Sequence, residues 1–376
     1  MDSKVILETV LHREEITAIE ALMLMREDEK ILPELCKVAD TLNQRFNRTS
    51  VTYVKSKQIS YTNVCRAECS FCSFWRKKGQ KGAFTLGPDD VVRQIREAWP
   101  VKQVVLTGGL NPDLTLPYHL EILRAIREAY PSVHIHGYSP SEIHFLARRS
   151  RMPSGDVLRR FREAGLDSLS GDSADILNDK LRKKICSDKL RTGDWADVIK
   201  TAHKLGMTTT ATILFGHVED EIYICEHLEI IKNIQRETGG FTAFEPQAFV
   251  PHGTDLARSA KIKGAVPAER VLQMVAIARI FFSRLIKHIS IDWTKTGLDL
   301  AMKCLSAGAN DLGALTYDPF EIRLAEINGR GGVAVPALRA AIQKAGRSPH
   351  ERDAWTLRTI PAASQSQRPR EELVLA

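Results

Sequence analysis

Long apolar runs are missing from this chain. No segment approaches the roughly 18 consecutive apolar residues that a membrane-spanning helix requires, so we expect no membrane partner. The first residues, MDSKVILETVLHREE, lack the basic-then-apolar pattern of a secretory signal. We therefore expect a cytoplasmic protein, in a reducing compartment where cysteine thiols stay free.

Clustered charge of one sign is also missing. No block of like charges is long enough to form a nucleic-acid groove, and aromatic residues do not interleave with basic ones, so we expect no nucleic-acid partner. The formal net charge of +7 is modest and weakly favours a small anionic substrate. With 43% hydrophobic and 26% charged residues, the composition is typical of a soluble globular protein.

Cysteine is scarce, but three of the seven cysteines gather in one stretch, YTNVCRAECSFCSFWRKKG. Cys65, Cys69 and Cys72 have the spacing C-x3-C-x2-C. Thiolates are the usual ligands of iron–sulfur clusters. Because a cubane cluster has four irons, three thiolates leave one iron without a local protein ligand, and chemistry takes place at an open metal position.

Other uses of these three cysteines fit less well. A disulfide would strand the third thiol, and a zinc site needs four ligands or three plus water. No C-x2-C or H-x3-H pair follows at zinc-finger spacing, and buried unreactive cysteine is the general alternative. The stretch predicts a [4Fe–4S] cluster. The other cysteines are scattered and are expected to be small core residues; they are Cys36, Cys186, Cys225 and Cys304.

Hydrophobic periodicity predicts an α/β fold. Residues 1–47 have helical spacing, and residues 51–54 and 58–64 alternate as two short strands that lead into the cysteine loop. After the loop, β-rich runs alternate with helical patterns; the runs cover 101–109, 133–139, 166–171, 207–216, 241–249, 287–293 and 308–315. About eight such repeats with right-handed connections indicate a parallel TIM-like (β/α) barrel.

Three parts are expected along the chain. Residues 1–50 form an N-terminal helical cap, residues 51–355 the barrel, and residues 356–376 a polar tail. A chain of 376 residues is long for one core, but an α/β barrel can absorb this length as a single domain.

Polar and glycine-rich segments stand where the barrel strands are expected to end. They are the cysteine loop and residues 107–109, 139–142, 171–173, 216–219 and 310–311. Because active sites of such barrels lie at the carboxyl ends of the strands, these independent signals agree on one site.

The cysteine loop at the end of the first barrel strand resembles that of radical S-adenosylmethionine (SAM) enzymes. Further motifs resemble the menaquinone and coenzyme F420 branch over roughly residues 50–355; they are GGLNPDL, HIHGYSPSEI, AGLDSL, TAHKLGMTTTATILFGHVE, ETGGFTAF and GANDLG. The resemblance implies that the open iron chelates SAM and that one electron cleaves it to methionine and a 5′-deoxyadenosyl radical. It also implies a small-molecule substrate and an external one-electron reductant such as flavodoxin or ferredoxin.

Signals for one member of the branch are mixed. RKKICSDKL, FWRKKGQKGAFTL, LRAIREAYP and PHERD resemble aminofutalosine synthase, whereas VTYV, YTNVC, HGYSPSE and GANDLG resemble the tyrosine-using FO synthase subunit or dehypoxanthine futalosine cyclase. Residues 170–173 (SGDS) and 251–254 (PHGT) depart from the usual PGG or PGT and E-N-T segments, which leaves a divergent substrate open.

Three functions follow as hypotheses. The leading one is an aminofutalosine synthase-like enzyme, in which the adenosyl radical adds to the enol ether of 3-[(1-carboxyvinyl)oxy]benzoate with loss of CO2. The second abstracts hydrogen from tyrosine, for transfer of its 4-hydroxybenzyl group to 5-amino-6-ribitylaminouracil, or from a futalosine derivative. The third is a non-catalytic iron–sulfur electron-transfer or sensor protein, against which the barrel argues because a simple electron carrier needs no large pocket.

The resemblance also assigns cofactor-binding residues. Phe71 stands where relatives place an aromatic near adenine, and simple loop packing is the alternative. Gly108 and Gly109 match the family's glycine pair beside the methionine moiety, although alone they would indicate an ordinary turn. Asp175 and Arg182 match positions that contact ribose or the methionine carboxylate, with a surface salt bridge as the alternative.

Candidate catalytic and substrate residues are the polar groups after the other strands. Glu142, His217 and Glu219 are acid–base or substrate candidates, because histidine titrates near neutrality; a structural histidine is the alternative. Asn310 and Asp311 are expected to bind polar groups of the substrate at the barrel mouth.

Overall fold

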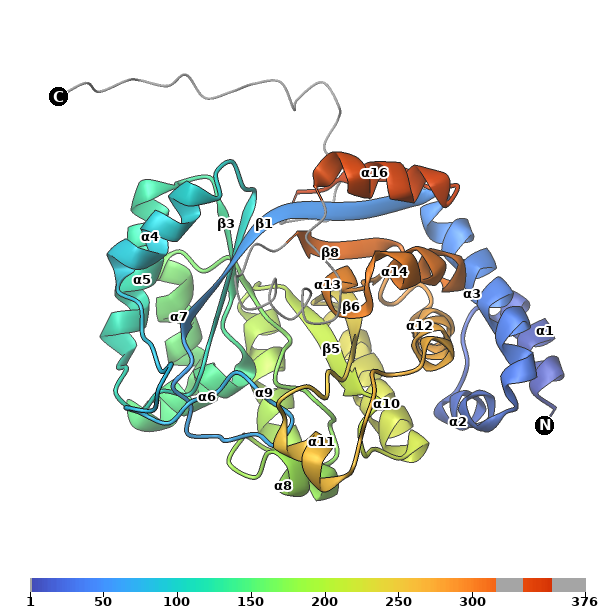
Figure 1. The fold of residues 1–376 in the computed structure, drawn as a ribbon, viewed down its shortest axis with the longest axis horizontal. Coiled ribbons are helices and arrows are strands. Elements are labelled where there is room, and N and C mark those ends of the chain that lie inside the picture. Colours follow the sequence, from blue (N-terminus) through green and yellow to red (C-terminus); the bar gives the residue numbers. More distant parts are fainter. Residues whose placement is uncertain (1, 316–333, 354–376) are drawn as a thin grey trace.

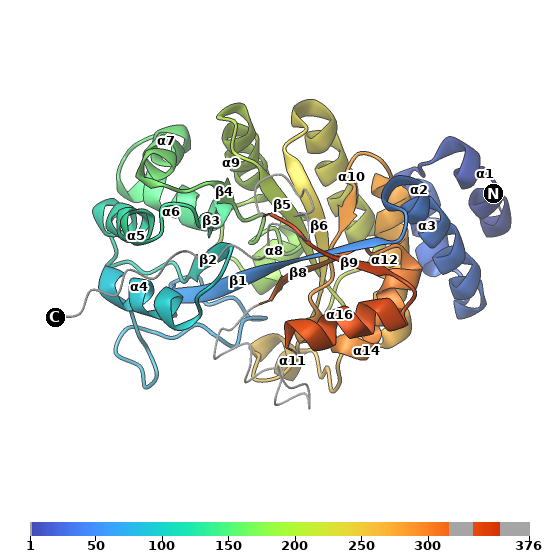
Figure 2. The ribbon, with the colours of Figure 1, turned by 90° about the horizontal axis from the view of Figure 1, so that it is seen from above.

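The computed structural model describes residues 2–315 and 334–353. Its centre is a curved sheet of parallel strands with helices ranged around the outside (Figures 1 and 2). The strands are β1 Ser50–Thr62, β2 Gln103–Gly108, β3 His134–Gly137, β4 Ser168–Leu169, β5 Thr209–Phe215, β6 Phe241–Ala248, β7 His288–Ile289, β8 Asp311–Leu315 and β9 Ser348–Glu351.

The sheet curls far enough for its two edges to meet. The strand order is β7-β6-β5-β4-β3-β2-β1-β8, and β9 pairs with β1. At the edges, Ser290 just after β7 forms a parallel bridge with Asp311, and the Ile291 N–H donates to the Asp311 carbonyl at 2.9 Å. The predicted TIM-like α/β barrel is therefore confirmed.

Helices connect the strands in the alternation that the sequence predicts. In the amino-terminal half they are α1 Ser3–Arg13, α2 Ala18–Arg26, α3 Leu32–Asn47, α4 Pro88–Glu97, α5 Leu116–Ala129, α6 Pro140–Arg149, α7 Ser154–Ala164 and α8 Asp179–Ile185. Then follow α9 Thr192–Lys204, α10 Glu221–Thr238, α11 Asp255–Ser259, α12 Ala268–Phe282, α13 Trp293–Thr296, α14 Leu298–Cys304 and α16 Val335–Lys344. Among the described helices, none has the length and apolar character to cross a bilayer.

The N-terminal helices pack on one flank of the barrel, α2 against α10 and α3 against α12 (Figure 1). A buried cation stabilises this contact: the Lys232 ammonium donates to the Ile16 carbonyl at 3.1 Å and lies 4.3 Å from the centre of the Phe281 ring. The expected polar tail, residues 356–376, lies outside the described residues.

Strand β1 is one element of 13 residues where the sequence suggested two short strands. Its two halves have different neighbours: residues 56–62 pair with β2, whereas residues 50–55 pair with β8 and β9. Because both halves are paired, the polar stretch in the middle, Lys55 to Gln58, continues the strand instead of ending it.

Sequence reasoning missed six elements, α6, α8, α11, α13, α16 and β9. The segment SPSE at the start of α6 is a capping box, in which the Ser139 and Glu142 side chains satisfy each other's backbone N–H groups, with Pro140 in the first turn. In the sequence this segment resembles a loop, because the helix starts almost immediately after β3. Helix α8, seven residues capped by Asn178, is too short to show a clear period.

Candidate active site

A cavity of about 390 Å³ opens at the carboxyl ends of the strands. It is lined by residues of β1, β2, β5 and β6, by the cysteine loop, and by the segments that follow β3 and β4. Cys65, Cys69 and Cys72 all face it. The structure thus brings the three cysteines to the place where barrel enzymes carry their chemistry.

All seven cysteines are free thiols, so no disulfide competes for this loop. Three hydrogen bonds from backbone N–H groups fix the loop: the Ser70 N–H donates to the Ile185 carbonyl (2.9 Å), the Cys65 N–H to the Arg76 carbonyl (3.1 Å), and the Leu110 N–H to the Cys65 sulfur (3.3 Å). No group of three or more His, Cys, Asp or Glu side chains in the described part converges tightly enough for a single metal ion. Three thiols spread around one cavity fit a multi-iron cluster better than one zinc ion.

Electrostatics of the thiols are consistent with this fit. Burial raises the pKa of the Cys69 thiol well above its ordinary value, and the Lys189 ammonium acts in the opposite direction. Burial also raises the pKa of Cys72. A bound metal deprotonates its thiol ligands outright. The positive charge of iron would therefore stabilise these thiolates despite their burial.

Gly108 and Gly109 form the wall beside the cysteine loop, and neither position has room for a side chain. A Cβ on Gly109 would lie 2.3 Å from the Val64 carbonyl oxygen and 2.8 Å from the Cys65 Cβ. A Cβ on Gly108 would lie 2.2 Å from the Tyr61 ring. Both glycines line the cavity, so the wall is bare backbone that a ligand can approach closely.

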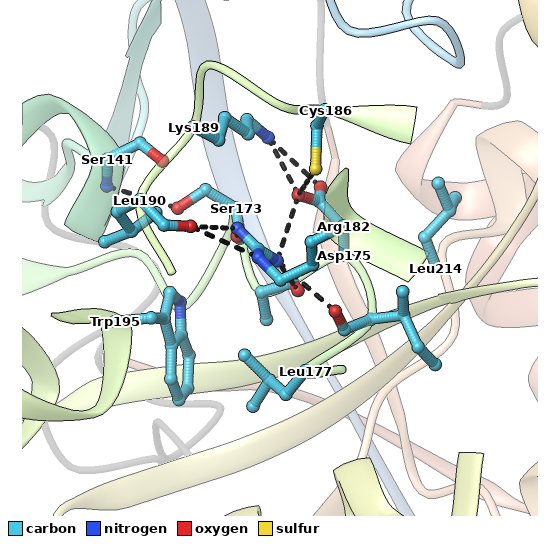
Figure 3. Close-up of polar contacts among 12 residues, drawn as sticks. Ser141, Ser173, Asp175, Leu177, Arg182, Cys186, Lys189, Leu190, Trp195 and Leu214 are labelled. Carbon is cyan, nitrogen blue, oxygen red and sulfur yellow. Dashed lines mark hydrogen bonds and ion pairs between the residues drawn. The ribbon is translucent and has the colours of Figure 1, made fainter. Parts of the chain in front are cut away.

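Asp175 and Phe71 line the same cavity, and Lys189 contacts both of them. Figure 3 shows the contact between Lys189 and Asp175. The Lys189 ammonium is 3.0 and 3.1 Å from the two Asp175 carboxylate oxygens and 5.2 Å from the centre of the Phe71 ring. Burial raises the pKa of Asp175, but the charges of Lys189 and Arg182 lower it by more. The pKa of Asp175 therefore lies below its ordinary value. Asp175 is therefore ionised at neutral pH.

Arg182 does not line the cavity. Its guanidinium donates to backbone carbonyls of this chain, among them Leu190 (2.9 Å) and Ser173 (3.2 Å), and lies 3.5 Å from Asp175 (Figure 3). All three nitrogens of the guanidinium therefore donate hydrogen bonds to backbone carbonyls inside the protein. The predicted direct contact with a cofactor carboxylate does not match this geometry, and we propose instead that Arg182 positions the segment carrying Asp175.

Glu142 combines a structural contact with a place on the cavity. It accepts hydrogen bonds from the Tyr61 hydroxyl, from the Ser139 N–H (2.7 Å) and from the Ser139 hydroxyl (2.8 Å). Burial raises the pKa of Glu142 to about 7 even though these hydrogen bonds lower it. Its proton can therefore be exchanged near neutral pH.

Comparisons with known proteins agree with this geometry. A family model described as "Radical SAM superfamily" matches residues 59–231, and one described as "CofH/MqnC C-terminal region" matches residues 238–364. A Methanocaldococcus jannaschii protein is 37% identical over 343 residues, which is 90% of this chain and 95% of the relative. The chain belongs to the radical SAM superfamily. The predicted cofactors, a [4Fe–4S] cluster and SAM, are thereby confirmed, as is the expectation of a radical SAM transferase.

The M. jannaschii relative is a 5-amino-6-(D-ribitylamino)uracil–L-tyrosine 4-hydroxyphenyl transferase. An Archaeoglobus fulgidus protein with the same activity is 38% identical over 341 residues, covering 89% of this chain and 97% of the relative. Among solved structures, the FeFe-hydrogenase maturase HydG from Carboxydothermus hydrogenoformans has a TM-score of 0.71 at 16% identity, covering 95% of this chain and 81% of that one. Methylornithine synthase has a TM-score of 0.65 at 17% identity, covering 89% and 99%. At such identities, these structures support the radical SAM fold alone.

Two of the predicted catalytic residues do not reach the radical SAM cavity. Glu219 accepts hydrogen bonds from the backbone N–H groups of Gly216 and His217. The His217 ring lies 3.1 Å from the Glu219 carboxylate and 3.2 Å from the Leu214 carbonyl. Both side chains are almost completely buried in the turn after β5 and are absent from the cavity wall, so the geometry gives them a turn-forming role.

Asn310 and Asp311 lie at the opposite end of the barrel, which corrects the prediction that they follow a strand. They stand at the start of β8, level with Thr52 near the start of β1. Asp311 accepts hydrogen bonds from Thr52 (2.6 Å), Ser290 (2.8 Å) and Arg352 (2.7 Å). The motif GANDLG was placed after the eighth strand because its apolar residues are few; its last residues are the strand itself.

Asn310 is equally occupied. Its side-chain oxygen accepts from Arg279 (2.7 Å) and from the Ile289 N–H (3.0 Å). Although burial raises the pKa of Asp311, the Arg352 guanidinium lowers it to about 2. Neither residue has a free group to offer a substrate.

Sequence reasoning missed a polar floor on the inner side of β6. The Gln247 amide donates to Glu245 (3.0 Å) and to Asp172 (3.3 Å), and Gln247 and Asp172 line the cavity. Burial and the nearby Asp292 carboxylate raise the pKa of Glu245 to about 8. The signal was present in FTAFEPQAF, because two polar residues two positions apart on a buried strand share one face.

Proposed function

We propose that this radical SAM enzyme transfers the 4-hydroxybenzyl group of L-tyrosine to 5-amino-6-(D-ribitylamino)uracil. The observation that carries the proposal is the similarity along nearly the whole chain to relatives with this class of activity, through both the cluster-binding half and the CofH/MqnC C-terminal region. The same comparisons favour this alternative over the leading sequence-based hypothesis, aminofutalosine synthase. The motifs HGYSPSE and GANDLG were thus more informative than RKKICSDKL and PHERD.

The cavity offers groups that suit these substrates. Its wall includes the aromatic side chains Phe71, Phe74 and Phe249, against which a phenol or uracil ring can pack. Its floor includes Asp172 and Gln247, and carboxylates and amides bind hydroxyl and ammonium groups. A ribityl chain carries several hydroxyls, and tyrosine carries an ammonium group. Two substrates of mixed aromatic and polar character therefore match the lining.

The protein's own residues have three tasks in this proposal. Cys65, Cys69 and Cys72 hold the cluster, and the glycine wall lets SAM approach it. When bound and reduced by one electron, the [4Fe–4S] cluster and SAM supply a 5′-deoxyadenosyl radical that takes a hydrogen atom from tyrosine. Glu245 has a positioning role, because its carboxyl accepts a hydrogen bond from the Gln247 amide (3.0 Å) and so orients that amide on the cavity floor.

An external one-electron donor, such as a flavodoxin or ferredoxin, is part of the proposal, and so is a cytoplasmic location. Glu142, His217 and Glu219 are proposed as supporting groups. Glu142 holds the start of α6 against Tyr61, and the other two shape the turn after β5.

The fate of the adenosyl group tests the proposal. The anaerobically reconstituted enzyme is incubated with dithionite, adenosyl-labelled SAM, L-tyrosine and 5-amino-6-(D-ribitylamino)uracil, and products are followed by mass spectrometry. We expect label in free 5′-deoxyadenosine, in step with a product that contains the tyrosine ring. In a parallel reaction with 3-[(1-carboxyvinyl)oxy]benzoate, an adduct that retains the adenosyl carbons would refute the proposal in favour of aminofutalosine synthase.

A further inference from the structure

A second cavity of about 480 Å³ lies beside the active-site cavity, on the outside of the barrel. Residues of α6, the segment 187–191, the start of α9 and the cysteine loop line it. Five of its side chains are cationic; they are Arg66, Arg148, Arg149, Lys189 and Arg191. We call it the basic cavity.

Most of this positive charge is not neutralised. Arg66, Arg148, Arg149 and Arg191 are exposed, and none forms an ion pair with another described residue. Lys189 is the exception, since it pairs with Asp175. Two carboxylates also line the cavity, Asp188 and Asp194, and Asp194 accepts a hydrogen bond from the Arg191 N–H at the start of α9. The cationic groups outnumber the acidic ones, so the surface attracts negative charge.

The basic cavity is separated from the cluster ligands by a wall one residue thick. Leu110, Ser141 and Lys189 line both cavities. The Leu110 N–H donates to the Cys65 sulfur at 3.3 Å, and its carbonyl accepts from the Arg66 N–H at 3.1 Å. A single residue thus contacts a cluster thiol on one side and the basic surface on the other.

We propose that the basic cavity is the docking site of an acidic one-electron carrier protein, which rests on the external reductant of the proposed function. A carrier seated there gives one electron to the oxidised cluster and is itself oxidised by one electron, and no covalent bond changes. Charge complementarity selects the carrier, because arginines from three separate segments present a broad positive rim to an acidic face. The path through Leu110 then keeps the two redox centres close.

The test uses the reconstituted holoenzyme and a reduced flavodoxin whose surface around the flavin is acidic. The rate of cluster reduction is followed by optical and electron paramagnetic resonance spectroscopy, without tyrosine or the uracil substrate. In the double variant Arg148→Glu/Arg149→Glu we expect reduction by flavodoxin to slow about tenfold or more at low ionic strength, because steering by charge raises association rates by such factors. Reduction by dithionite, which needs no docking, should stay unchanged.

Matched controls keep the outcome clear. Arg124→Glu/Arg160→Glu makes the same change of charge at two exposed positions on α5 and α7 that line neither cavity, and it should leave the flavodoxin rate near that of the wild type. Arg148→Lys/Arg149→Lys keeps the charge and should retain most of the rate.

Equal slowing in the control pair, or no slowing in the Arg148/Arg149 pair, would overturn the proposal. The proposal would also be overturned if the wild-type enzyme bound inorganic phosphate saturably while the Arg148→Glu/Arg149→Glu variant kept the wild-type rate of reduction by flavodoxin. That result would assign the cavity to a small anion. Because no transferase substrate is present, failure here is distinct from failure of the proposed reaction.

Discussion

Both ends of the barrel carry carboxylates, a fully buried one at the amino end and a partly buried one at the carboxyl end, and the two have different surroundings. At the amino end, Asp311 accepts from Thr52, Ser290, Arg352 and the Gly313 N–H, so each of its oxygens has partners within the protein. At the carboxyl end, Asp172 accepts from one described side chain, Gln247, at 3.3 Å, and faces the cavity. A buried carboxylate whose bonds are all satisfied stabilises the fold, whereas one with free acceptors can bind a ligand.

Cluster loss is the largest change that the carboxyl end allows. Cys69→Ala should abolish SAM cleavage, because three thiolates are the full set of protein ligands that the motif offers. Iron content, optical spectra and 5′-deoxyadenosine formation measure this. Cys225→Ala, a buried thiol on α10 away from the cavity, is the control and should keep both cluster and cleavage. A triple Cys65/Cys69/Cys72→Ala variant that still carries a working cluster would contradict the assignment.

Breaking the amino-end network should cost stability. Asp311→Ala leaves the buried Arg352 guanidinium without its partner, and removing one member of a buried pair costs about 3–5 kcal/mol. Urea unfolding of the anaerobic protein measures the free energy of unfolding. The matched variant at the other end, Asp172→Ala, should change that free energy by about 1 kcal/mol or less while product formation falls. If Asp172→Ala lowered the free energy of unfolding more than Asp311→Ala did, the comparison between the two ends would be wrong.

The same pair predicts a pH dependence. Since the pKa of Asp311 is held at about 2, below its value in the unfolded chain, its stabilising contribution is present above that unfolded value and is lost as pH falls toward about 2. Unfolding of the wild-type protein should therefore become easier in this acidic range, and Asp311→Asn should flatten that part of the profile. Equal slopes in the two proteins would remove Asp311 from the explanation.

Cofactor affinity should respond to the glycine wall. Gly109→Val places a side chain against the Val64 carbonyl and Cys65, so the wall must move away from the cluster loop. A lost close contact of about 1.5–3 kcal/mol corresponds to roughly tenfold to hundredfold weaker SAM binding, measured by equilibrium dialysis at unchanged iron content. Gly193→Val, at a glycine with no atom within 4 Å of its added Cβ, is the control. Identical affinities in the two variants would show that SAM binds elsewhere.

At the carboxyl end, the pH dependence of the free energy of unfolding should have the opposite sign. Because the pKa of Glu245 is raised to about 8 in the folded protein, native Glu245 keeps a proton that the unfolded chain has lost between about pH 4.5 and 8. Its contribution to the free energy of unfolding thus falls as pH rises through this window. Glu245→Gln should remove that decline in urea titrations, and an unaltered slope would argue that the carboxylate is already ionised.

Local patterns in the sequence predicted the fold and the cysteine loop well. The alternation of strand-like and helix-like hydrophobic patterns predicts the barrel without any knowledge of contacts. The spacing of Cys65, Cys69 and Cys72 defines the cysteine loop within eight residues. The carboxyl-end placement of Gly108 and Gly109 followed from strand ends that are clear in the sequence.

Residues whose role depends on distant partners were not predictable in this way. Asp311 was assigned to the wrong end because one strand boundary was misplaced by a few residues, and its partner Arg352 is 41 positions away. His217 after β5 looked like a catalytic residue, but whether it faces a cavity or the turn depends on packing that the sequence does not display. The same holds for the contact between Leu110 and Cys65, 45 positions apart.

The pairing of β1 has a consequence for the order of events during synthesis. Its carboxyl half, which leads into the cysteine loop, finds β2 about fifty residues later, so the loop is anchored early. Its amino half pairs with β8 and β9, the last strands made. Until the ribosome has produced residues 311 and 348, the amino half of β1 lacks both of its strand partners. The cysteine loop and the closing edge of the sheet therefore depend on pairings of one strand with partners from opposite ends of the chain.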